Sequence, residues 1–224
     1  MLQELTYFCR LRLMVKKGYI ETNNGKEISK SFLTGIKNKL FYASKQRKME
    51  LLAFVLRKRI KGKVILFRRT TFGAEKVYKY LVKLGHKTVC IHSEKSKEEQ
   101  KKSLRAFTSD DAEFLVVTDV SLKDLKLERV SFIINFDLPS SPTAYFDRQF
   151  LLESKGLSFV FCSLEEKKTV RAIEGIIEKR LLVEKNHPFN DDLEEFVSGV
   201  RRPSNVSRKS RKSDGSKKKK KRWY

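Results

Sequence analysis

Five short apolar runs, separated by segments with helical spacing, place the strongest limit on how this chain can fold. The runs are rich in Val, Ile, Leu and Phe, as is typical of strands that are buried on both faces. Alternation of strands and helices with short links favours right-handed crossovers and a parallel sheet with helices on both faces. The sequence therefore predicts an α/β domain with strands near residues 63–67, 87–91, 114–117, 130–135 and 157–162.

Local signals mark where the intervening helices begin. Ser96 with Glu99, and Ser163 with Glu166, have the spacing of a capping box, and Pro142 suits the first turn of a helix. We expect helices over about 44–59, 72–84, 96–107 and 142–153, and another after Ser163.

Positive charge is the second strong feature of the chain. It has 50 Lys and Arg against 27 Asp and Glu, a formal net charge of +23. Residues 200–224 hold twelve of the basic residues and one acid, so this segment carries about half of the excess. Such a balance favours a polyanionic partner, with nucleic acid ahead of an anionic membrane surface, although a solvated basic surface is the plainer alternative.

The last eight residues combine this charge with two aromatic side chains, Trp223 and Tyr224. Basic side chains bind phosphates by counterion release, and aromatic rings stack on unpaired bases. The pattern does not distinguish RNA from DNA, and a solubilising tail is the alternative. The candidate nucleic-acid ligands are Lys217, Lys218, Lys219, Lys220, Lys221 and Arg222.

Neither a metal site nor a membrane segment is expected. Cys9, Cys90 and Cys162 are far apart, and none forms a CxxC pair or a Cys/His cluster. Reduced thiols of this kind fit a cytoplasmic location. The N-terminus lacks the pattern of a signal peptide, and residues 51–56 are too short an apolar run to span a bilayer.

Polar and charged side chains follow several of the predicted strands. Arg68 and Arg69 follow the first, His92 the second, and Thr118 and Asp119 the third. Ligands of parallel sheets are met at the carboxyl ends of the strands. Arg68 and Arg69 are therefore candidate phosphate ligands, with a solvated pair as the alternative, whereas a lone His92 is more typical of a structural role.

Four segments resemble the second RecA-like lobe of the DEAD-box RNA helicases. Within that family, the resemblance is strongest to the bacterial RhlE-like group. The resemblance spans about residues 36–188. KVILFRRTTF resembles the strand around motif IV, and IHSEKSKEEQKKSLRAF the segment that follows it. LVVTDVSLKDLKL resembles motif V, and FIINFDLPSSPTAYFDRQF the run into motif VI. This resemblance implies a single RecA-like C-terminal lobe, in which Thr118 and Asp119 contact RNA; capping of the next helical turn is their alternative role.

Departures from the family pattern are concentrated where it holds nucleotide. The ribose-facing Asp of motif V is replaced by Lys126. In motif VI the first Arg is present as Arg148, the second falls at Leu151, and the third has no counterpart. Arg148 could bridge to another lobe or to phosphate, or be a surface Arg. The two later arginines are the family's arginine fingers, whose loss costs several orders of magnitude in rate.

These features predict an RNA-binding lobe without ATPase activity of its own and without a catalytic residue. The 224 residues contain no GxxxxGK[ST] motif and no DEAD-like run of acids, so ATP and Mg²⁺ are expected only if a separate first lobe completes the enzyme. Completion by such a lobe is the first alternative, and a protein-interaction module, for instance within a ribonucleoprotein, is the second. The expected organisation is a poorly defined segment 1–35, the lobe 36–186, and a basic, largely disordered tail 187–224.

Overall fold

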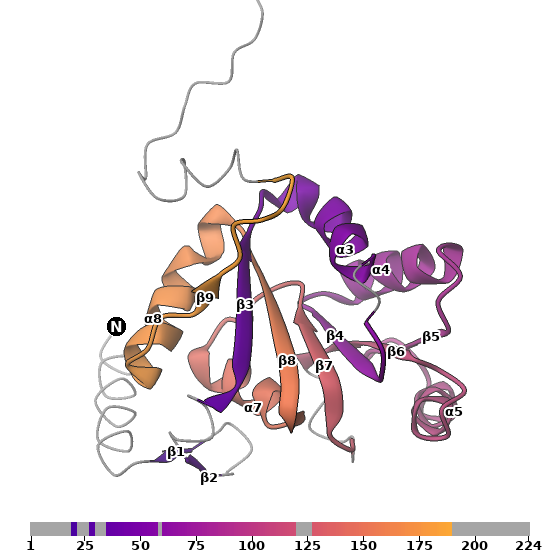
Figure 1. Ribbon diagram of the computed structural model, residues 1–224. Helices are drawn as coiled ribbons and strands as arrows, with labels where there is room; N and C mark the ends of the chain where they lie inside the picture. Colours follow the sequence, from indigo (N-terminus) through magenta and orange to yellow (C-terminus); the bar gives the residue numbers. More distant parts are fainter. Residues whose placement is uncertain (1–18, 22–26, 30–34, 58–59, 120–126, 190–224) are drawn as a thin grey trace, which may run out of the picture.

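A parallel sheet forms the centre of the protein, as the apolar runs predict, and it contains seven strands (Figure 1). The computed structural model describes residues 19–21, 27–29, 35–57, 60–119 and 127–189. In spatial order the strands are β5 (Thr88–Ile91), β6 (Phe114–Thr118), β4 (Val64–Arg68), β7 (Val130–Asn135), β8 (Leu152–Cys162), β3 (Lys37–Tyr42) and β9 (Leu182–Val183).

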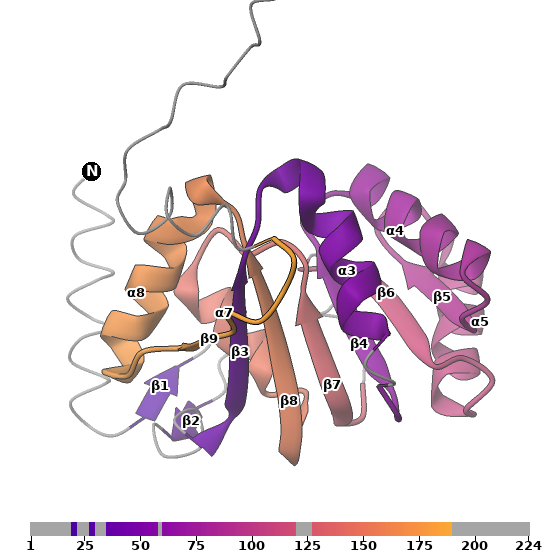
Figure 2. The same ribbon diagram turned by 45° about the horizontal axis from the view of Figure 1, so that its top comes forward.

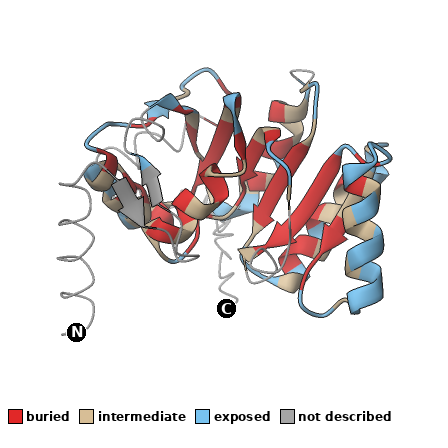
Figure 3. Cartoon of the chain, turned by 90° about the horizontal axis from the view of Figure 1, so that it is seen from below, coloured by how far each residue is buried: buried red, intermediate tan, exposed pale blue. Residues whose placement is uncertain are grey.

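Helices cover both faces of this sheet, and each face has its own apolar core. One core joins the strands to α5 (Lys97–Thr108), α7 (Pro142–Gln149) and α8 (Lys167–Ile177). The other joins them to α3 (Lys48–Leu56) and α4 (Thr71–Lys83). In Figure 2, α3 lies in front of the strands and α7 behind them, and Figure 3 shows the strands as the most continuously buried part. Single turns of 3-10 helix, η1 (Lys45–Arg47) and η2 (Leu164–Glu166), precede α3 and α8.

Two of the predicted boundaries, both around residue 150, are wrong for one reason. The helix expected to reach residue 153 ends at Gln149, and the strand expected from residue 157 begins at Leu152. Tertiary contacts override the local pattern here. Leu152 is fully buried and pairs with Val130 of β7, whose backbone N–H donates to the Leu151 carbonyl at 2.8 Å.

Two short pieces lie at the ends of the described chain. β1 (Tyr19–Glu21) and β2 (Glu27–Ser29) form a separate antiparallel pair within the segment 1–35, which was expected to be poorly defined. Near the other end, His187 and Phe189 are buried, and Phe189 belongs to the core formed with α3 and α4. The six tail residues predicted to bind nucleic acid, Lys217 to Arg222, lie outside the described residues. No helix within the described ranges is long and apolar enough to cross a bilayer.

Because the seven strands are parallel, all their carboxyl ends meet at one edge of the sheet. Arg68 ends β4, Thr118 ends β6 and Asn135 ends β7. Arg68 and Thr118 are register partners in neighbouring strands. The topology therefore brings the predicted site residues of two strands to a common edge.

Candidate nucleic-acid interface

Arg148 is the most completely buried charged residue at this edge. Its side chain is 0% exposed, and it comes from α7 beneath the carboxyl ends of β6 and β7. Nε and Nη2 donate to the two carboxylate oxygens of Asp119, each at 2.7 Å. Nη1 donates to Asn135 Oδ1 at 2.9 Å and to the Asp137 carbonyl at 2.8 Å. The guanidinium also lies over the Phe67 ring, 4.6 Å from its centroid.

The alternative role of Arg148, as a surface arginine, is therefore wrong. Its hydrogen bonds join the ends of β6 and β7 to α7, and a fork–fork pair of this kind fixes geometry as well as charge. The guanidinium has no exposed face in the described structure, so the geometry supports a positioning role over direct contact with phosphate. Asp119 keeps one side open, with its side chain 32% exposed. The motif V residues 120–126, including Lys126, lie outside the described residues.

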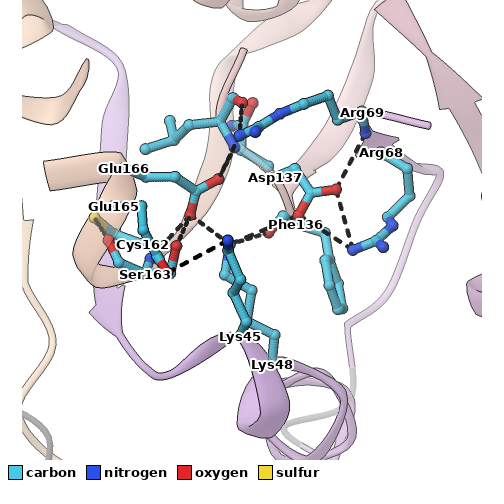
Figure 4. Close-up of polar contacts among 12 residues, drawn as sticks. Lys45, Lys48, Arg68, Arg69, Phe136, Asp137, Cys162, Ser163, Glu165 and Glu166 are labelled. Carbon is cyan, nitrogen blue, oxygen red and sulfur yellow. Dashed lines mark hydrogen bonds and ion pairs between the residues drawn. The ribbon is translucent and has the colours of Figure 1, made fainter. Parts of the chain in front are cut away.

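A second buried ion pair holds α3 against the same edge (Figure 4). Lys48 is 2% exposed, and its Nζ donates to Glu166 Oε2 at 2.6 Å and to the Phe136 carbonyl at 2.7 Å. Glu166 also accepts hydrogen bonds from the Leu138 N–H at 2.9 Å and from the N–H and Oγ of Ser163 at 2.9 and 2.8 Å. Both oxygens of the buried carboxylate thus accept more than one hydrogen bond.

The donors around Glu166 decide its charge. Burial raises its pKa, but the nearby Lys48 charge and the hydrogen bonds from Lys48 and Ser163 outweigh burial. The net result is a pKa below the ordinary value of 4.5, so Glu166 is ionised at neutral pH.

Arg68 and Arg69 form the outer part of this network. Arg68 Nη1 lies 3.1 Å from Asp137 Oδ2, and its guanidinium lies 4.2 Å from the centroid of the Phe136 ring. Burial lowers the pKa of Arg68, and the Asp137 and Glu166 charges oppose that effect. Arg69 Nη2 reaches Glu166 Oε1 at 3.1 Å, yet its side chain remains 54% exposed. Of the two predicted phosphate ligands, Arg69 is therefore the accessible one.

A cavity of about 320 Å³ opens between these side chains. Its cationic lining comes from η1, α3, β4, α4 and the residue after β4, while Asp137 and Glu166 also line it and pair with the buried Lys48. The basic residues that line it are Lys45, Lys48, Arg68, Arg69 and Lys76. Surplus positive charge at the carboxyl edge of a parallel sheet is suited to an anionic ligand.

Glu75, Cys90 and His92 also gather near the edge, with potential ligand atoms within 4.8 Å of one another. His92 Nε2 lies 2.9 Å from Glu75 Oε1, and Lys95 Nζ lies 3.0 Å from the same oxygen. Burial raises the pKa of Cys90 to about 12. A protonated thiol and a carboxylate already paired with an ammonium favour a hydrogen-bonded cluster over a cation site, in keeping with a structural His92.

Comparisons with known proteins agree with this architecture. Residues 47–150 match the helicase conserved C-terminal domain. ATP-dependent RNA helicase RhlB of Shewanella piezotolerans is 32% identical over 185 residues, which cover 80% of this chain and 42% of the relative. RhlB of Shewanella pealeana is 31% identical over 181 residues, covering 79% of this chain and 42% of the relative.

Solved structures share the fold. A chain in the structure of the Escherichia coli DEAD-box protein SrmB bound to regulator of ribonuclease activity A superposes with a TM-score of 0.62 at 20% identity, and the match covers 66% of this chain and 90% of that chain. The C-terminal domain of the DEAD-box protein Dbp5 gives 0.60 at 22% identity, covering 75% of this chain and 99% of that domain. The chain is a DEAD-box RNA helicase C-terminal lobe. The RhlB relatives do not support the narrower RhlE-like resemblance, which stays a prediction.

Three residues of the ion-pair network at the carboxyl edge were not predicted as site residues from the sequence. Lys48 was missed although it lies three, four and seven positions before Leu51, Leu52 and Val55, which were expected to face the core. The same spacing places Lys48 on that inner face. Asp137 was part of a matched motif and Glu166 of a capping box, but only the fold shows that both reach the same lysine.

Proposed function

We propose that this DEAD-box C-terminal lobe binds single-stranded RNA and does not hydrolyse ATP by itself. The observation that carries the proposal is the cationic cavity at the carboxyl edge, with half-exposed Arg69 at its rim. Phosphates are its best-matched ligands, since guanidinium and ammonium groups there exceed the two carboxylates that neutralise them. The matched relatives are named RNA helicases, which favours RNA over other polyanions.

The same edge fits a nucleotide poorly. Arg148, the one arginine of the family's motif VI pattern that this chain retains, is fully buried and paired with Asp119. Leu151, at the position of the second arginine, is packed against the apolar core. Neither side chain is available to neutralise charge on a transferred phosphoryl group, which supports the absence of autonomous hydrolysis.

Completion by a separate first lobe is the second candidate function. The chain spans 42% of the length of the RhlB relatives, which are named as ATP-dependent helicases. In that case ATP and Mg²⁺ would be held mainly by the other lobe, with this chain supplying RNA contacts. Mixing the chain with the first lobe of a relative should then restore RNA-stimulated phosphate release that neither part shows alone.

The salt dependence of binding tests the proposed function. We expect the affinity for a single-stranded RNA of about 12 nucleotides to fall steeply with salt, because each phosphate contact contributes a slope of about −0.7 in log K against log [salt]. Deleting residues 200–224, which hold twelve Lys and Arg, should flatten the slope by several units and leave weaker binding by the lobe. Fluorescence anisotropy at KCl concentrations from about 50 to 300 mM measures the affinity of each chain and its salt slope.

Substitutions that remove one positive charge distinguish binding at a specific site of the lobe from a general effect of its net charge. In the chain lacking 200–224, Arg69→Gln should reduce the slope by about 0.7. Lys102→Gln removes the same charge from an exposed position of α5 and should leave binding unchanged. Equal effects of the two variants would contradict a specific site at the carboxyl edge. A shallow slope in the full chain, unaltered by truncation, would contradict the role of the tail.

A further inference from the structure

Phe72 is the most exposed large apolar side chain among the described residues, with 80% of its surface accessible. Exposing a phenylalanine ring has a free-energy cost of about 1.5–3 kcal/mol relative to burying it. A single exposed aromatic is unremarkable on its own, and its surroundings decide whether it has a use.

At the start of α4, Phe72 lies in the chain between two residues that line the cationic cavity, Thr70 and Lys76. Arg68, Arg69 and Thr70 immediately precede the helix, and Thr70 caps it by accepting a hydrogen bond from the Gly73 N–H at 3.1 Å. Gly73 lies so close to Arg68 that an added Cβ would come within 2.5 Å of Nη2. This tight packing fixes the first turn of α4, and with it the Phe72 backbone, against the arginine that lines the cavity.

One face of α4 continues the positive surface away from Phe72. Lys76, Lys79 and Lys83 follow at intervals of four, seven and eleven residues, so the four side chains lie along one exposed stripe. Lys76 also lines the cavity. Within the part of the chain that the structure describes, these three lysines form no ion pair. The one acid of α4, Glu75, is paired with His92 and Lys95.

An isolated ring among cations matches nucleic acid better than protein. Cores of protein interfaces are contiguous, apolar and depleted in Lys, whereas this stripe has one aromatic and three lysines. Single-stranded nucleic acid needs an aromatic face for a base and cations for the flanking phosphates.

We propose that Phe72 is a stacking platform for an unpaired base of RNA, with the neighbouring phosphates held by Arg69 and Lys76. This inference rests on the proposed RNA binding and adds that the lobe contacts bases as well as backbone. Stacking is tolerant of base identity, so the contact would increase affinity for unpaired over paired RNA without selecting a sequence.

Replacing Phe72 with leucine removes the ring and keeps an apolar side chain. We expect the full-length F72L variant to bind a 12-nucleotide oligoadenylate about five- to 100-fold more weakly, with an unchanged salt slope. F72W should bind as the unaltered chain does, and L182A, which alters another exposed apolar residue at the far edge of the sheet, should have no effect. An abasic oligomer of the same length should bind the unaltered chain and F72L equally.

A fluorescence readout reports the contact directly. In a W223F background, the sole tryptophan of an F72W variant should be quenched by oligoadenylate and much less by the abasic oligomer. Equal oligoadenylate affinities of F72L and the unaltered chain would overturn the stacking inference and leave the proposed RNA binding intact. Failure of the unaltered chain to bind either oligomer would instead overturn the proposed function.

Discussion

Replacing Arg148 with methionine is expected to lower the free energy of unfolding by about 3–5 kcal/mol. The substitution keeps much of the side-chain volume but leaves Asp119, Asn135 Oδ1 and the Asp137 carbonyl without their donor. Buried acceptors without a partner cost their full desolvation energy, which is why breaking such a pair costs more than the pair contributes. Urea denaturation followed by circular dichroism measures the change.

A matched control is available on α5. Arg105→Met makes the same chemical change at an exposed residue with no ion pair in the described structure, and should shift the unfolding free energy by less than about 0.5 kcal/mol. Equal stabilities of the two variants would contradict the structural role assigned to Arg148. Such a result would instead favour direct contact with phosphate as the role of Arg148.

Lys48→Met should have a comparable effect, about 3–5 kcal/mol at pH 7, for a different reason. It leaves the Glu166 carboxylate buried and charged without its ammonium partner at 2.6 Å. Replacing both partners, as Lys48→Met with Glu166→Leu, should recover part of the loss, because the uncompensated charge is removed. The free energies of unfolding of the two variants and the unaltered chain, measured by chemical denaturation, distinguish the loss of contacts from the cost of an unpaired buried charge.

The pH dependence of this effect has a definite sign. In the unaltered chain the pKa of Glu166 is below its ordinary value of 4.5, so its contribution to stability is present above pH 4.5 and is lost as pH falls through the folded-state pKa. Without Lys48, burial prevails and the pKa of Glu166 should rise above the unfolded value. Its penalty is then absent at low pH and develops as pH increases.

The stability difference between the unaltered chain and Lys48→Met should therefore be largest near pH 7 and shrink as pH falls toward 4. Unfolding free energies measured at half-unit intervals between these limits give the curve. A difference that stayed constant across the range would contradict the charge argument and indicate lost packing alone.

Local periodicity predicted most of the sheet because its strands are buried on both faces. The five expected strands and the parallel arrangement are confirmed, with β7 at its predicted bounds. Leu152 shows the limit of that information, since it follows a helical pattern in sequence but pairs with Val130 in the fold. β9 has two residues and no pattern of its own, so only its pairing with Lys39 and Leu40 defines it.

The sequence predicted where the candidate site lies, at the carboxyl edge of the sheet. It did not predict the network of hydrogen bonds and ion pairs within the site. Strand ends marked Arg68, Arg69, Thr118 and Asp119, and the parallel topology brings them together. The direction of Arg148 into the core depends on partners contributed by β6 and β7, which a helical pattern alone does not reveal. The predicted cytoplasmic location and the boundaries at residues 36 and 187 stay predictions.

Phosphate release by the isolated 224-residue chain tests the central claim most directly. The measurement uses micromolar protein with Mg-ATP and single-stranded RNA at a concentration that anisotropy shows to be saturating. With Arg148 committed to Asp119 and Leu151 packed against the core, we predict RNA binding without release above the protein-free background. Turnover that increases in proportion to the concentration of the chain would contradict a lobe that binds RNA but does not hydrolyse ATP by itself.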